Sequence, residues 1–424
     1  MSRTRRPDPR AGGPSAARTP ASDGAPAEAF AIAAPGLAPL VADELRALDI
    51  APLRVEPAGV AFAGTPVAVL RANLHSRLAT RVVLRLATFT ARDFATLERE
   101  ARRVPWTRVL SAGDVAVLSV TCRKSRLYHS DAVAERVARA ITRALPAVSV
   151  DAAGGDDEDA GEGGAEEIAS AEVASAAGAR RQRLLVRFDR DVCTVSADTS
   201  GALLHRRGWR LATAKAPLRE TLAAALIASS GWPGDVPLVD PMGGAGTIAI
   251  EAALRARGLA PGLSRDFACE HWPGADRALI ARLREEAAAR TRSALSAPIV
   301  CADRDAGAIA ATDGNAARAG VRGDLTVLHQ PLSAMDLAAL GPRGWVVTNP
   351  PWGLRTGDPA TLRALWGRLG ALIRAAGPGW TLAAVVPDPQ YARELRLPLE
   401  TLLRTSAGGR PVSFVRSRLP EGEG

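Results

Sequence analysis

The chain has 424 residues, which is enough for two to four domains at roughly 100–200 residues per domain. Apolar residues make up 47% of it and charged residues 23%, a balance typical of a globular protein with a sizeable core. The formal net charge is +9, and nearly all of the 54 basic residues are arginines, since Lys124 and Lys215 are the only lysines. A basic surface attracts polyanions such as nucleic acids, although a GC-rich genome would enrich arginine as well.

The composition also argues against several classes of protein. No two cysteines form a CxxC pair and the histidines are scattered singly, so neither a zinc site nor a disulfide framework is expected. No uncharged apolar run reaches the ~18 residues of a membrane helix. The basic start of the chain is not followed by the apolar segment of a signal peptide. We therefore expect a cytoplasmic protein without a membrane span or a bound metal.

The N-terminal half mixes short strands with helices. Residues 1–26 are rich in Pro, Gly, Ala, Ser and Arg, which predicts a disordered basic tail. Apolar spacing predicts a helix over residues 37–45 and a strand over 59–62. A second helix is expected after Ser130 as its N-cap, with apolar residues recurring every fourth position up to Leu145.

An acidic segment interrupts this half of the chain. Residues 151–167 hold eight Asp and Glu residues and no basic residue, which indicates a solvated insertion. A role as an RNA mimic or self-inhibitory arm is the alternative to a plain linker. Strand-like patterning resumes over residues 183–188.

The C-terminal half alternates strands with helices, which predicts an α/β fold with a parallel, doubly wound sheet. Its last strands, over residues 402–405 and 412–415, flank Gly408-Gly409 and predict a hairpin. A closing hairpin is typical of methyltransferases and less so of nicotinamide-binding domains. The other predicted strands cover residues 237–239, 298–302, 345–348 and 381–386.

A glycine-rich turn follows the first of these strands. Glycines let the backbone approach a ligand, and the start of the next helix offers free N–H groups. The acid at the strand end would repel a dinucleotide pyrophosphate but suits the ammonium group of S-adenosylmethionine. The alternative is an ordinary strand–helix turn. The residues predicted to bind this cofactor are Asp240, Pro241, Gly243, Gly244, Gly246 and Thr247.

A second acid ends the next strand. Asp303 follows Ile299–Ala302 and is placed to accept hydrogen bonds from the ribose hydroxyls of the cofactor. Asp305 could bind too, or could cap the helix that begins near Ala306. Asp303 lies 63 positions after Asp240, far beyond the roughly 20 residues of a minimal unit, so about 258–296 is an insertion.

The most specific motif is Asn349-Pro350-Pro351-Trp352, directly after the strand over 345–348. The two prolines stiffen the turn and remove two donors, which leaves the Asn349 side-chain oxygen and the Pro350 carbonyl as converging acceptors. Two acceptors that hold both hydrogens of an exocyclic amine can free its lone pair for methylation. Trp352 would stack on the flipped-out base. The alternative is a rigid turn with Trp352 in the core.

In this order the segments resemble the THUMP-domain RNA methyltransferases, most closely the family that methylates guanine amino groups in large-subunit ribosomal RNA. The likeness covers residue 30 to the C-terminus, apart from the acidic insertion. The segments that carry it are Leu204–Arg210, Lys215–Ala225, Asp240–Met242, Ala260–Arg265 and Asn349–Gly353, with Ser125–Ser130 and Asp198–Gly201 upstream.

This resemblance implies a division of the chain and further site residues. Pro217 would open a helix that flanks the cofactor. Arg123, Lys124 and Arg126 would contact RNA phosphates, although a solvated basic turn is equally consistent with them. The implied domains are a ferredoxin-like lead-in at 27–69, a THUMP-like RNA-binding domain at 70–197 with the acidic insertion at about 151–178, and a methyltransferase domain at 198–424.

Some residues depart from the family pattern. The family usually has Cys-Gly-Ser-Gly where this chain has Gly243–Gly246, and Tyr where it has Trp352. Both changes preserve the proposed chemistry. An acid common after the family motif is Leu354 here, which leaves open how the acceptor turn is held and which base is chosen.

The combined hypothesis is a class I, Rossmann-like methyltransferase with a seven-stranded sheet, preceded by a smaller α/β RNA-binding region. It would transfer a methyl group from S-adenosylmethionine to guanine in structured RNA, with ribosomal RNA favoured over transfer RNA. An adenine-N6 or transfer-RNA guanine-N2 methyltransferase would satisfy the same motif, as would an enzyme acting on a protein glutamine. An NAD-dependent enzyme and a non-catalytic RNA-binding protein are the other classes considered.

Overall fold

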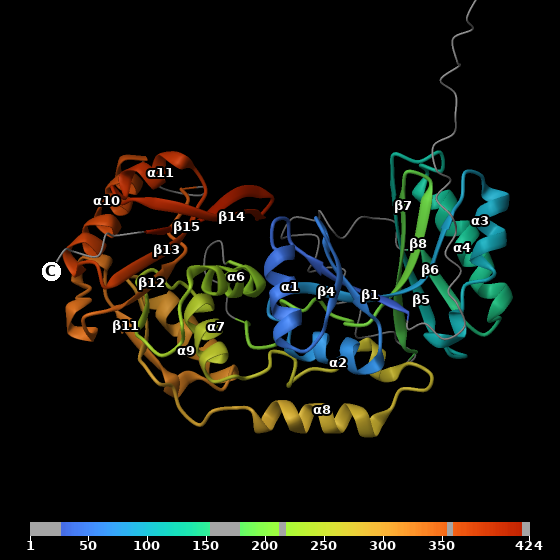
Figure 1. Ribbon diagram of the computed structural model, residues 1–424, viewed down its shortest axis with the longest axis horizontal. Coiled ribbons are helices and arrows are strands. Elements are labelled where there is room, and N and C mark those ends of the chain that lie inside the picture. The colour runs from blue at the N-terminus through green and yellow to red at the C-terminus, as the bar shows by residue number, and fades with distance from the viewer. Residues whose placement is uncertain (1–26, 153–178, 212–217, 354–358, 418–424) are drawn as a thin grey trace, which may run out of the picture.

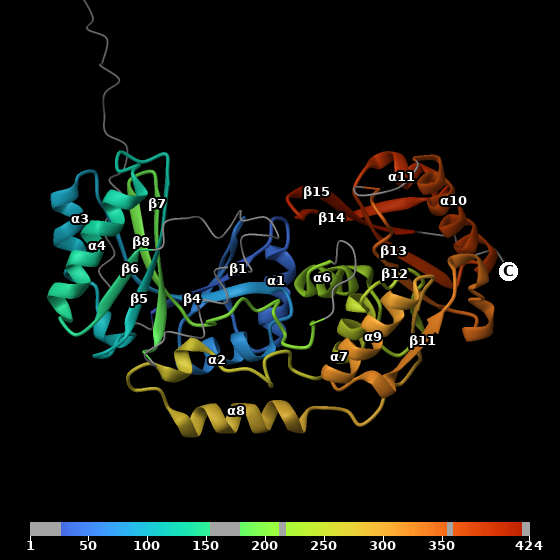
Figure 2. The same ribbon diagram turned by 180° about the vertical axis from the view of Figure 1, so that it is seen from behind.

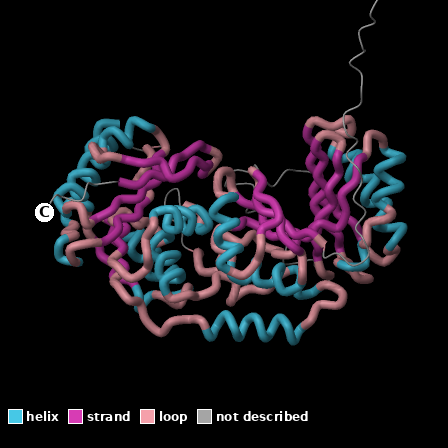
Figure 3. The backbone as a smooth tube through the Cα atoms, viewed as in Figure 1, coloured by secondary structure: helices cyan, strands magenta, loops and turns pink. Residues whose placement is uncertain are grey.

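The computed structural model describes residues 27–152, 179–211, 218–353 and 359–417, which form two lobes, each built around a β-sheet (Figure 1). The strands gather in two groups, with helices packed outside and between them (Figure 3). The predicted tail at 1–26, most of the acidic insertion and Pro217 lie outside the described residues. Among the described residues, no helix is long and apolar enough to span a bilayer.

The first sheet has eight strands in the order β2-β3-β1-β4-β8-β7-β5-β6. Its longest strand, β4, pairs with β1 on one side and β8 on the other, so the sheet is continuous from Glu28 to Asp198. The predicted boundary at 69/70 falls inside helix α2 of this sheet's first half. The strands are β1 (Glu28–Ala33), β2 (Pro52–Glu56), β3 (Gly59–Ala63), β4 (Ala79–Thr90), β5 (Val115–Arg123), β6 (Ser149–Ala152), β7 (Arg181–Asp189) and β8 (Val192–Asp198).

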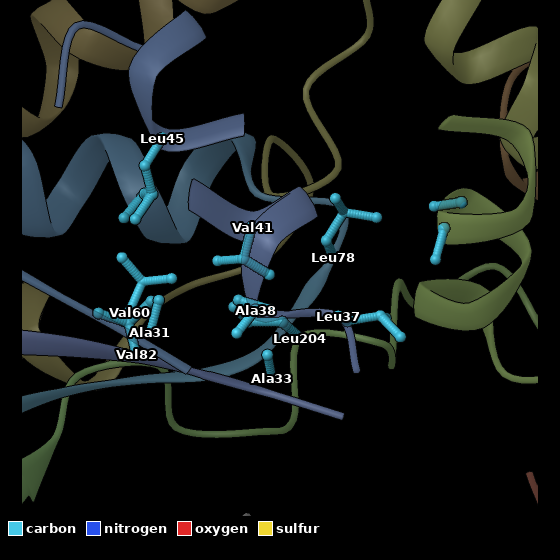
Figure 4. Close-up of a cluster of buried hydrophobic side chains, with 14 of the residues drawn as sticks. Ala31, Ala33, Leu37, Ala38, Val41, Leu45, Val60, Leu78, Val82 and Leu204 are labelled. Carbon is cyan, nitrogen blue, oxygen red and sulfur yellow. The ribbon is translucent and has the colours of Figure 1, made fainter. Parts of the chain in front are cut away.

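Four helices accompany this sheet: α1 (Ala38–Ala47), α2 (Pro66–His75), α3 (Phe94–Ala101) and α4 (Ser130–Ala144). Helix α1 lays Val41 and Leu45 onto Ala31, Val60 and Val82 of the strands (Figure 4). The spacing of these buried residues is that of one helical face on an alternating strand, as the sequence predicted. Helix α4 begins at Ser130 itself, after His129, and has no side-chain cap, so the predicted N-cap role of Ser130 is wrong.

The second sheet has seven strands in the order β11-β10-β9-β12-β13-β15-β14. The first five run parallel, and the last two form an antiparallel hairpin that closes the edge. This is the predicted α/β fold with a closing hairpin. The strands are β9 (Leu238–Asp240), β10 (Ile299–Asp303), β11 (Leu325–His329), β12 (Gly344–Thr348), β13 (Trp380–Val386), β14 (Leu399–Ala407) and β15 (Arg410–Ser417).

Helices cover both faces of this second sheet. Val347 and Ala383 face a core shared with α6, α7 and α9, whereas Val346 and Leu382 face Trp366 of α10. Strands buried on both sides explain the continuous apolar runs in the sequence. The helices are α6 (Glu220–Ser230), α7 (Thr247–Ala256), α9 (Ala306–Arg318), α10 (Pro359–Ala376) and α11 (Pro389–Glu394).

The expected insertion at 258–296 is an excursion that reaches the other lobe. Its helix α8 (Arg277–Ala289) runs along α2, as both views show (Figures 1 and 2). The Gly262 amide donates to the Leu74 carbonyl at 2.9 Å, and the Trp272 indole donates to Gln182 Oε1 at 2.6 Å. A methylene at Gly262 would collide with the Leu74 backbone. The excursion therefore fastens the two lobes together.

Buried charges join the lobes as well. Glu251 of α7 is almost completely buried and pairs with the Arg207 side chain at 3.2 Å and with Arg77 at 3.8 Å. Arg207 also donates to the Leu204 carbonyl at 2.6 Å and to the Arg77 carbonyl at 2.8 Å. Burial lowers the pKa of Arg77 to about 10, against the opposing pull of Glu251. The carboxylate thus depends on two arginines for its counter-charge.

Removing one partner of this buried cluster should be costly. Arg207→Met keeps the aliphatic stem but leaves Glu251 with only the distant Arg77. Removing one partner of a buried ion pair costs about 3–5 kcal/mol, so we expect the free energy of unfolding, measured in urea, to fall by about 3 kcal/mol. Arg282→Met removes an exposed pair with Glu286 on α8 and should change stability by less than about 0.5 kcal/mol. Equal effects of the two substitutions would contradict the role given to Arg207.

Candidate active site at the carboxyl ends of three strands

The three predicted motifs meet at one edge of the second sheet. They follow β9, β10 and β12, which are neighbours in the order β10-β9-β12 and run parallel. The carboxyl ends of parallel neighbours point to the same edge, where α/β folds bind their ligands. Segments separated by more than 100 residues in sequence are therefore brought together, as predicted.

Asp240 lies at the centre of this edge. Its side chain is buried, and its Oδ1 accepts a hydrogen bond from Thr348 Oγ1 at 2.7 Å and another from the Met242 amide at 3.2 Å. Burial raises the pKa of Asp240 to about 7, and the neighbouring Asp303 carboxylate adds to the rise, against the lowering effect of the two hydrogen bonds. A buried acid that ionises with difficulty becomes a favourable partner for a cationic ligand.

The glycine-rich turn is held by backbone and side-chain contacts. The Gly243 amide donates to the Ala302 carbonyl at 2.9 Å, and a side chain on Gly243 would collide with Cys301 Sγ. Gly246 has a φ of +81°, in the left-handed region, and a Cβ there would meet Thr312. The two glycines are thus required for the turn to pack against β10 and α9.

Polar residues of α9 hold the same turn. Thr312 Oγ1 donates to the Gly244 carbonyl at 2.9 Å, and Asn315 Nδ2 donates to the Ala245 carbonyl at 3.0 Å. Both side chains are completely buried. Neither residue was predicted to belong to the site, although two polar residues at i and i+3 among the alanines of a helix were a possible signal.

The two acids after β10 have different tasks. Asp303 Oδ2 accepts from the Gly244 amide at 3.0 Å, which ties the end of β10 to the glycine turn. Asp305 Oδ1 accepts from the amides of Gly307 and Ala308 at 2.7 and 3.2 Å. Asp305 is therefore the N-cap of α9, the alternative considered for it above. The ribose contact of Asp303 stays a prediction.

Thr247 begins helix α7, immediately after the turn. Its Oγ1 accepts from Arg210 Nη2 at 3.0 Å, and the same guanidinium donates to the Leu218 carbonyl at 2.6 Å and pairs with Glu220 at 3.1 Å. Pro217, the other predicted cofactor residue of this region, lies outside the described residues. Arg210 was not singled out from the sequence, yet it joins the start of α6 to the start of α7.

The Asn-Pro-Pro-Trp turn follows β12 directly. Asn349 is half-buried, Pro350 is buried and Pro351 is exposed. The Trp352 indole Nε1 donates to Asn349 Oδ1 at 3.0 Å. Trp352 is partly buried against the core, and its indole also orients the asparagine. Its stacking on a base stays a prediction. A carbonyl oxygen has two lone pairs, so Asn349 Oδ1 retains one for a ligand.

Thr348 links this turn to the glycine turn. It is the last residue of β12, directly before Asn349, and its hydroxyl bonds Asp240. The sequence placed Thr348 on the strand but gave it no role. Through this bond the candidate acceptor turn and the candidate cofactor turn are fixed side by side.

The predicted RNA-binding residues lie elsewhere. Arg123 is the last residue of β5 in the first sheet, Lys124 and Arg126 lie in the loop that follows, and all three are exposed. Both views place the strands β5 to β8 at the opposite end of the molecule from β11 to β15 (Figures 1 and 2). The structure therefore separates a basic loop on one lobe from the methylation motifs on the other.

Comparisons with known proteins agree with this architecture. Residues 207–397 match the family described as RMKL-like, methyltransferase domain, and residues 28–83 match the RlmL ferredoxin-like domain. A Syntrophotalea carbinolica protein named ribosomal RNA large subunit methyltransferase K/L is 34% identical over 91% of this chain and 52% of its own length. The chain thus spans about half the length of this relative.

Other relatives match over nearly their whole length. A Synechocystis sp. protein whose name describes an RNA methyltransferase is 30% identical over 92% of this chain and 96% of its own. A Listeria monocytogenes structure whose name describes an N6-adenine-specific DNA methylase is 28% identical, with a TM-score of 0.77 over 92% of this chain and 95% of that one.

The sheet order, the closing hairpin and the strand-end motifs define a class I methyltransferase. S-Adenosylmethionine, predicted from the sequence, is the methyl donor of such an enzyme. With the matches above, the chain belongs to the RMKL-like methyltransferase family.

The raised pKa of Asp240 predicts pH-dependent cofactor binding. Below about pH 7 the cofactor-free carboxyl group holds a proton, and a cation beside it favours the ionised form. Cofactor binding should therefore release a proton, so that affinity rises with pH up to about 7 and then levels off. Titration calorimetry between pH 5 and 8 in buffers of different ionisation enthalpy measures both effects. The Asp240→Asn variant should bind the cofactor more weakly, with an affinity that does not change with pH. A wild-type affinity that is constant between pH 5 and 8 would mean that Asp240 does not contact the cofactor.

The indole–amide bond predicts a positioning role for Trp352. Trp352→Phe keeps an aromatic ring but removes the donor to Asn349. Loss of one such bond, worth about 1 kcal/mol, should lower kcat about fivefold. KM for the cofactor should stay unchanged, as measured by initial rates of methyl transfer. An unchanged kcat would mean that Asn349 is oriented without this bond.

Proposed function

We propose that this chain transfers a methyl group from S-adenosylmethionine to the exocyclic amino group of a guanine in large-subunit ribosomal RNA. The observation that carries the proposal is the Thr348–Asp240 hydrogen bond at 2.7 Å. It fixes the Asn-Pro-Pro-Trp turn beside the glycine-rich turn, so that an amine held by one lies next to a cofactor held by the other. The names of the K/L relatives support ribosomal RNA as the substrate, which would place the reaction in the cytoplasm.

The cofactor-binding residues are supported by the chemistry of the site. S-Adenosylmethionine is cationic at its sulfonium and ammonium groups, which suits Asp240, and its ribose hydroxyls would donate to Asp303. Gly243, Gly244 and Gly246 would contact the cofactor through their backbone, while the Cβ positions of Gly243 and Gly246 face Cys301 and Thr312 of the protein. When bound, the cofactor supplies an activated methyl group. Among the described residues, no cluster of potential metal ligands is present.

The chain's own residues would prepare the amine. We assign one amine hydrogen to the free lone pair of Asn349 Oδ1 and the other to the Pro350 carbonyl. Both acceptors sit on a turn in which two prolines restrict rotation and supply no competing N–H donor. Such a grip directs the nitrogen lone pair away from its ring and toward the methyl group. The Trp352 face would stack on the base after it leaves its helix.

A second candidate is adenine-N6 methylation. Adenine presents the same two amine hydrogens to Asn349, and the Listeria relative is named for that activity on DNA. Transfer RNA guanine is the other nucleic-acid alternative. For all of these, we propose that residues 70–197 bind the RNA through a THUMP-like surface that includes Arg123, Lys124 and Arg126.

One experiment separates the candidates. Methyl groups from labelled cofactor are offered to undermodified ribosomal RNA and to transfer RNA, and the digested product is identified by nucleoside mass spectrometry. The proposal requires N2-methylguanosine in ribosomal RNA. N6-Methyladenosine would favour the second candidate, and no transfer by an enzyme that binds the cofactor would overturn the proposal.

Asn349 should be essential for turnover but not for cofactor binding. Asn349→Ala removes one amine acceptor, and we expect kcat to fall about 100- to 1000-fold, the range seen when a positioned polar group is lost from a reaction centre. The cofactor dissociation constant should change less than about twofold, since a twofold change is only ~0.4 kcal/mol. Rates and calorimetry on the same preparation test both statements. Retained activity would make the turn structural.

A further inference from the structure

The loop after β5 is part of a larger built surface on the first lobe. It lies against the β7–β8 turn: the Arg126 amide donates to Asp191 Oδ1 at 2.7 Å, and the Asp191 amide donates to Ser125 Oγ at 3.0 Å. The Arg190 amide donates to the Arg123 carbonyl at 3.2 Å. The end of β4 joins them, because the Ala91 amide donates to the Asp191 carbonyl at 2.9 Å. Three chain segments thus form one surface, called here the β5-loop surface.

This surface carries more cations than its acids can neutralise. Arg92 pairs with Asp191 at 3.4 Å, and Arg190 lies 4.0 Å from Asp189. Within the part of the chain that the structure describes, the side chains of Arg123, Lys124 and Arg126 form no hydrogen bond or ion pair. Three uncommitted cations in four residues are suited to the phosphates of a nucleic acid.

An aromatic ring stands out from the same loop. Leu127 is buried and anchors the loop to the core, whereas the next residue, Tyr128, is 67% exposed. Its ring lies 4.0 Å from the ring of His129, at an interplanar angle of 40°. Burial of an aromatic ring stabilises a folded protein, so an exposed ring such as that of Tyr128 contributes little to the stability of the fold. Its position among cations resembles the stacking platforms of proteins that bind single-stranded nucleic acids.

The backbone of this surface is held in an uncommon conformation. Lys124, Arg190 and Asp191 have φ values of +48°, +49° and +64°, in the left-handed region. Residues other than glycine rarely adopt this backbone conformation, which costs about 1 kcal/mol or more per residue. The hydrogen bonds of Ser125 and Asp191 hold the loop in place despite this cost. The backbone positions that carry the cations and the ring are therefore fixed relative to one another.

We propose that Tyr128 stacks on an unpaired base of the RNA, while Arg123, Lys124 and Arg126 hold the phosphates on either side. This inference rests on the proposed function, which supplies RNA as the partner. It adds that this lobe requires a single-stranded end or loop, and not only the shape of a double helix. The ring of Tyr128 can stack on any of the four bases. The contact therefore selects RNA with an unpaired base and does not select a particular base.

Two RNA probes test the inference: a two-stranded duplex with a 3′ overhang of about ten nucleotides, within the usual site size, and the same duplex with blunt ends and no unpaired loop. Tyr128→Ala should weaken binding of the overhang RNA about 5- to 150-fold, the range for one stacked base. It should leave blunt RNA unchanged. Tyr128→Phe should restore binding, because the ring and not the hydroxyl is required. 2-Aminopurine placed in the overhang should be quenched by the wild type and not by Tyr128→Ala.

Leu53→Ala is the matched control, since Leu53 is 56% exposed on the edge strand β2 at the far side of the same sheet. It should bind both probes as the wild type does. Equal binding by Tyr128→Ala and wild type would overturn the inference and favour a protein as the partner of this ring. An equal loss on blunt RNA would also overturn it. If the wild type methylates ribosomal RNA in either case, the proposed function stands by itself.

Discussion

The hydrogen bond from Thr348 to Asp240 is the constraint on which the candidate site depends. It joins the ends of two adjacent parallel strands, and each end continues into a turn with its own chemical task. Because the parallel register fixes which residues are last, a shift of one residue would turn Thr348 away from the carboxylate and would carry Asn349 with it. The pairing of the strands thus decides which side chains meet at this edge of the sheet.

The charge of the site has a similar origin. Asp240 and Asp303 end neighbouring strands, so their carboxylates lie at the same edge of the sheet, where Asp240 is buried and Asp303 partly exposed. Burial and the nearby Asp303 carboxylate raise the pKa of Asp240, so its ionisation is a cost that the free protein bears. A cation removes the cost when it binds. The glycine turn, held by Thr312, leaves the backbone accessible at the same place.

Much of this was predictable from the sequence, for identifiable reasons. Strands buried on both faces give continuous apolar runs, and a polar residue directly after such a run marks the strand end, as at Asp240 and Asn349. The partners of buried polar residues were not predictable in the same way: Thr312 stands out among the alanines of its helix, but its contact with Gly244 spans 68 residues. Ser130 was wrongly predicted as a cap, since cap and first helical residue differ by a single position. The continuous eight-stranded sheet was also missed, because strand order is not a local property.

The excursion between α7 and β10 makes the two lobes inseparable as fragments. A piece of the chain ending near residue 198 would contain α2 and Gln182 but not the Gly262 and Trp272 that cover them. A piece starting there would expose Phe267 and leave Glu251 with Arg207 but without Arg77. Each half would then present apolar surface and a poorly compensated charge to water. Tests of the proposed RNA binding therefore require both lobes on one polypeptide.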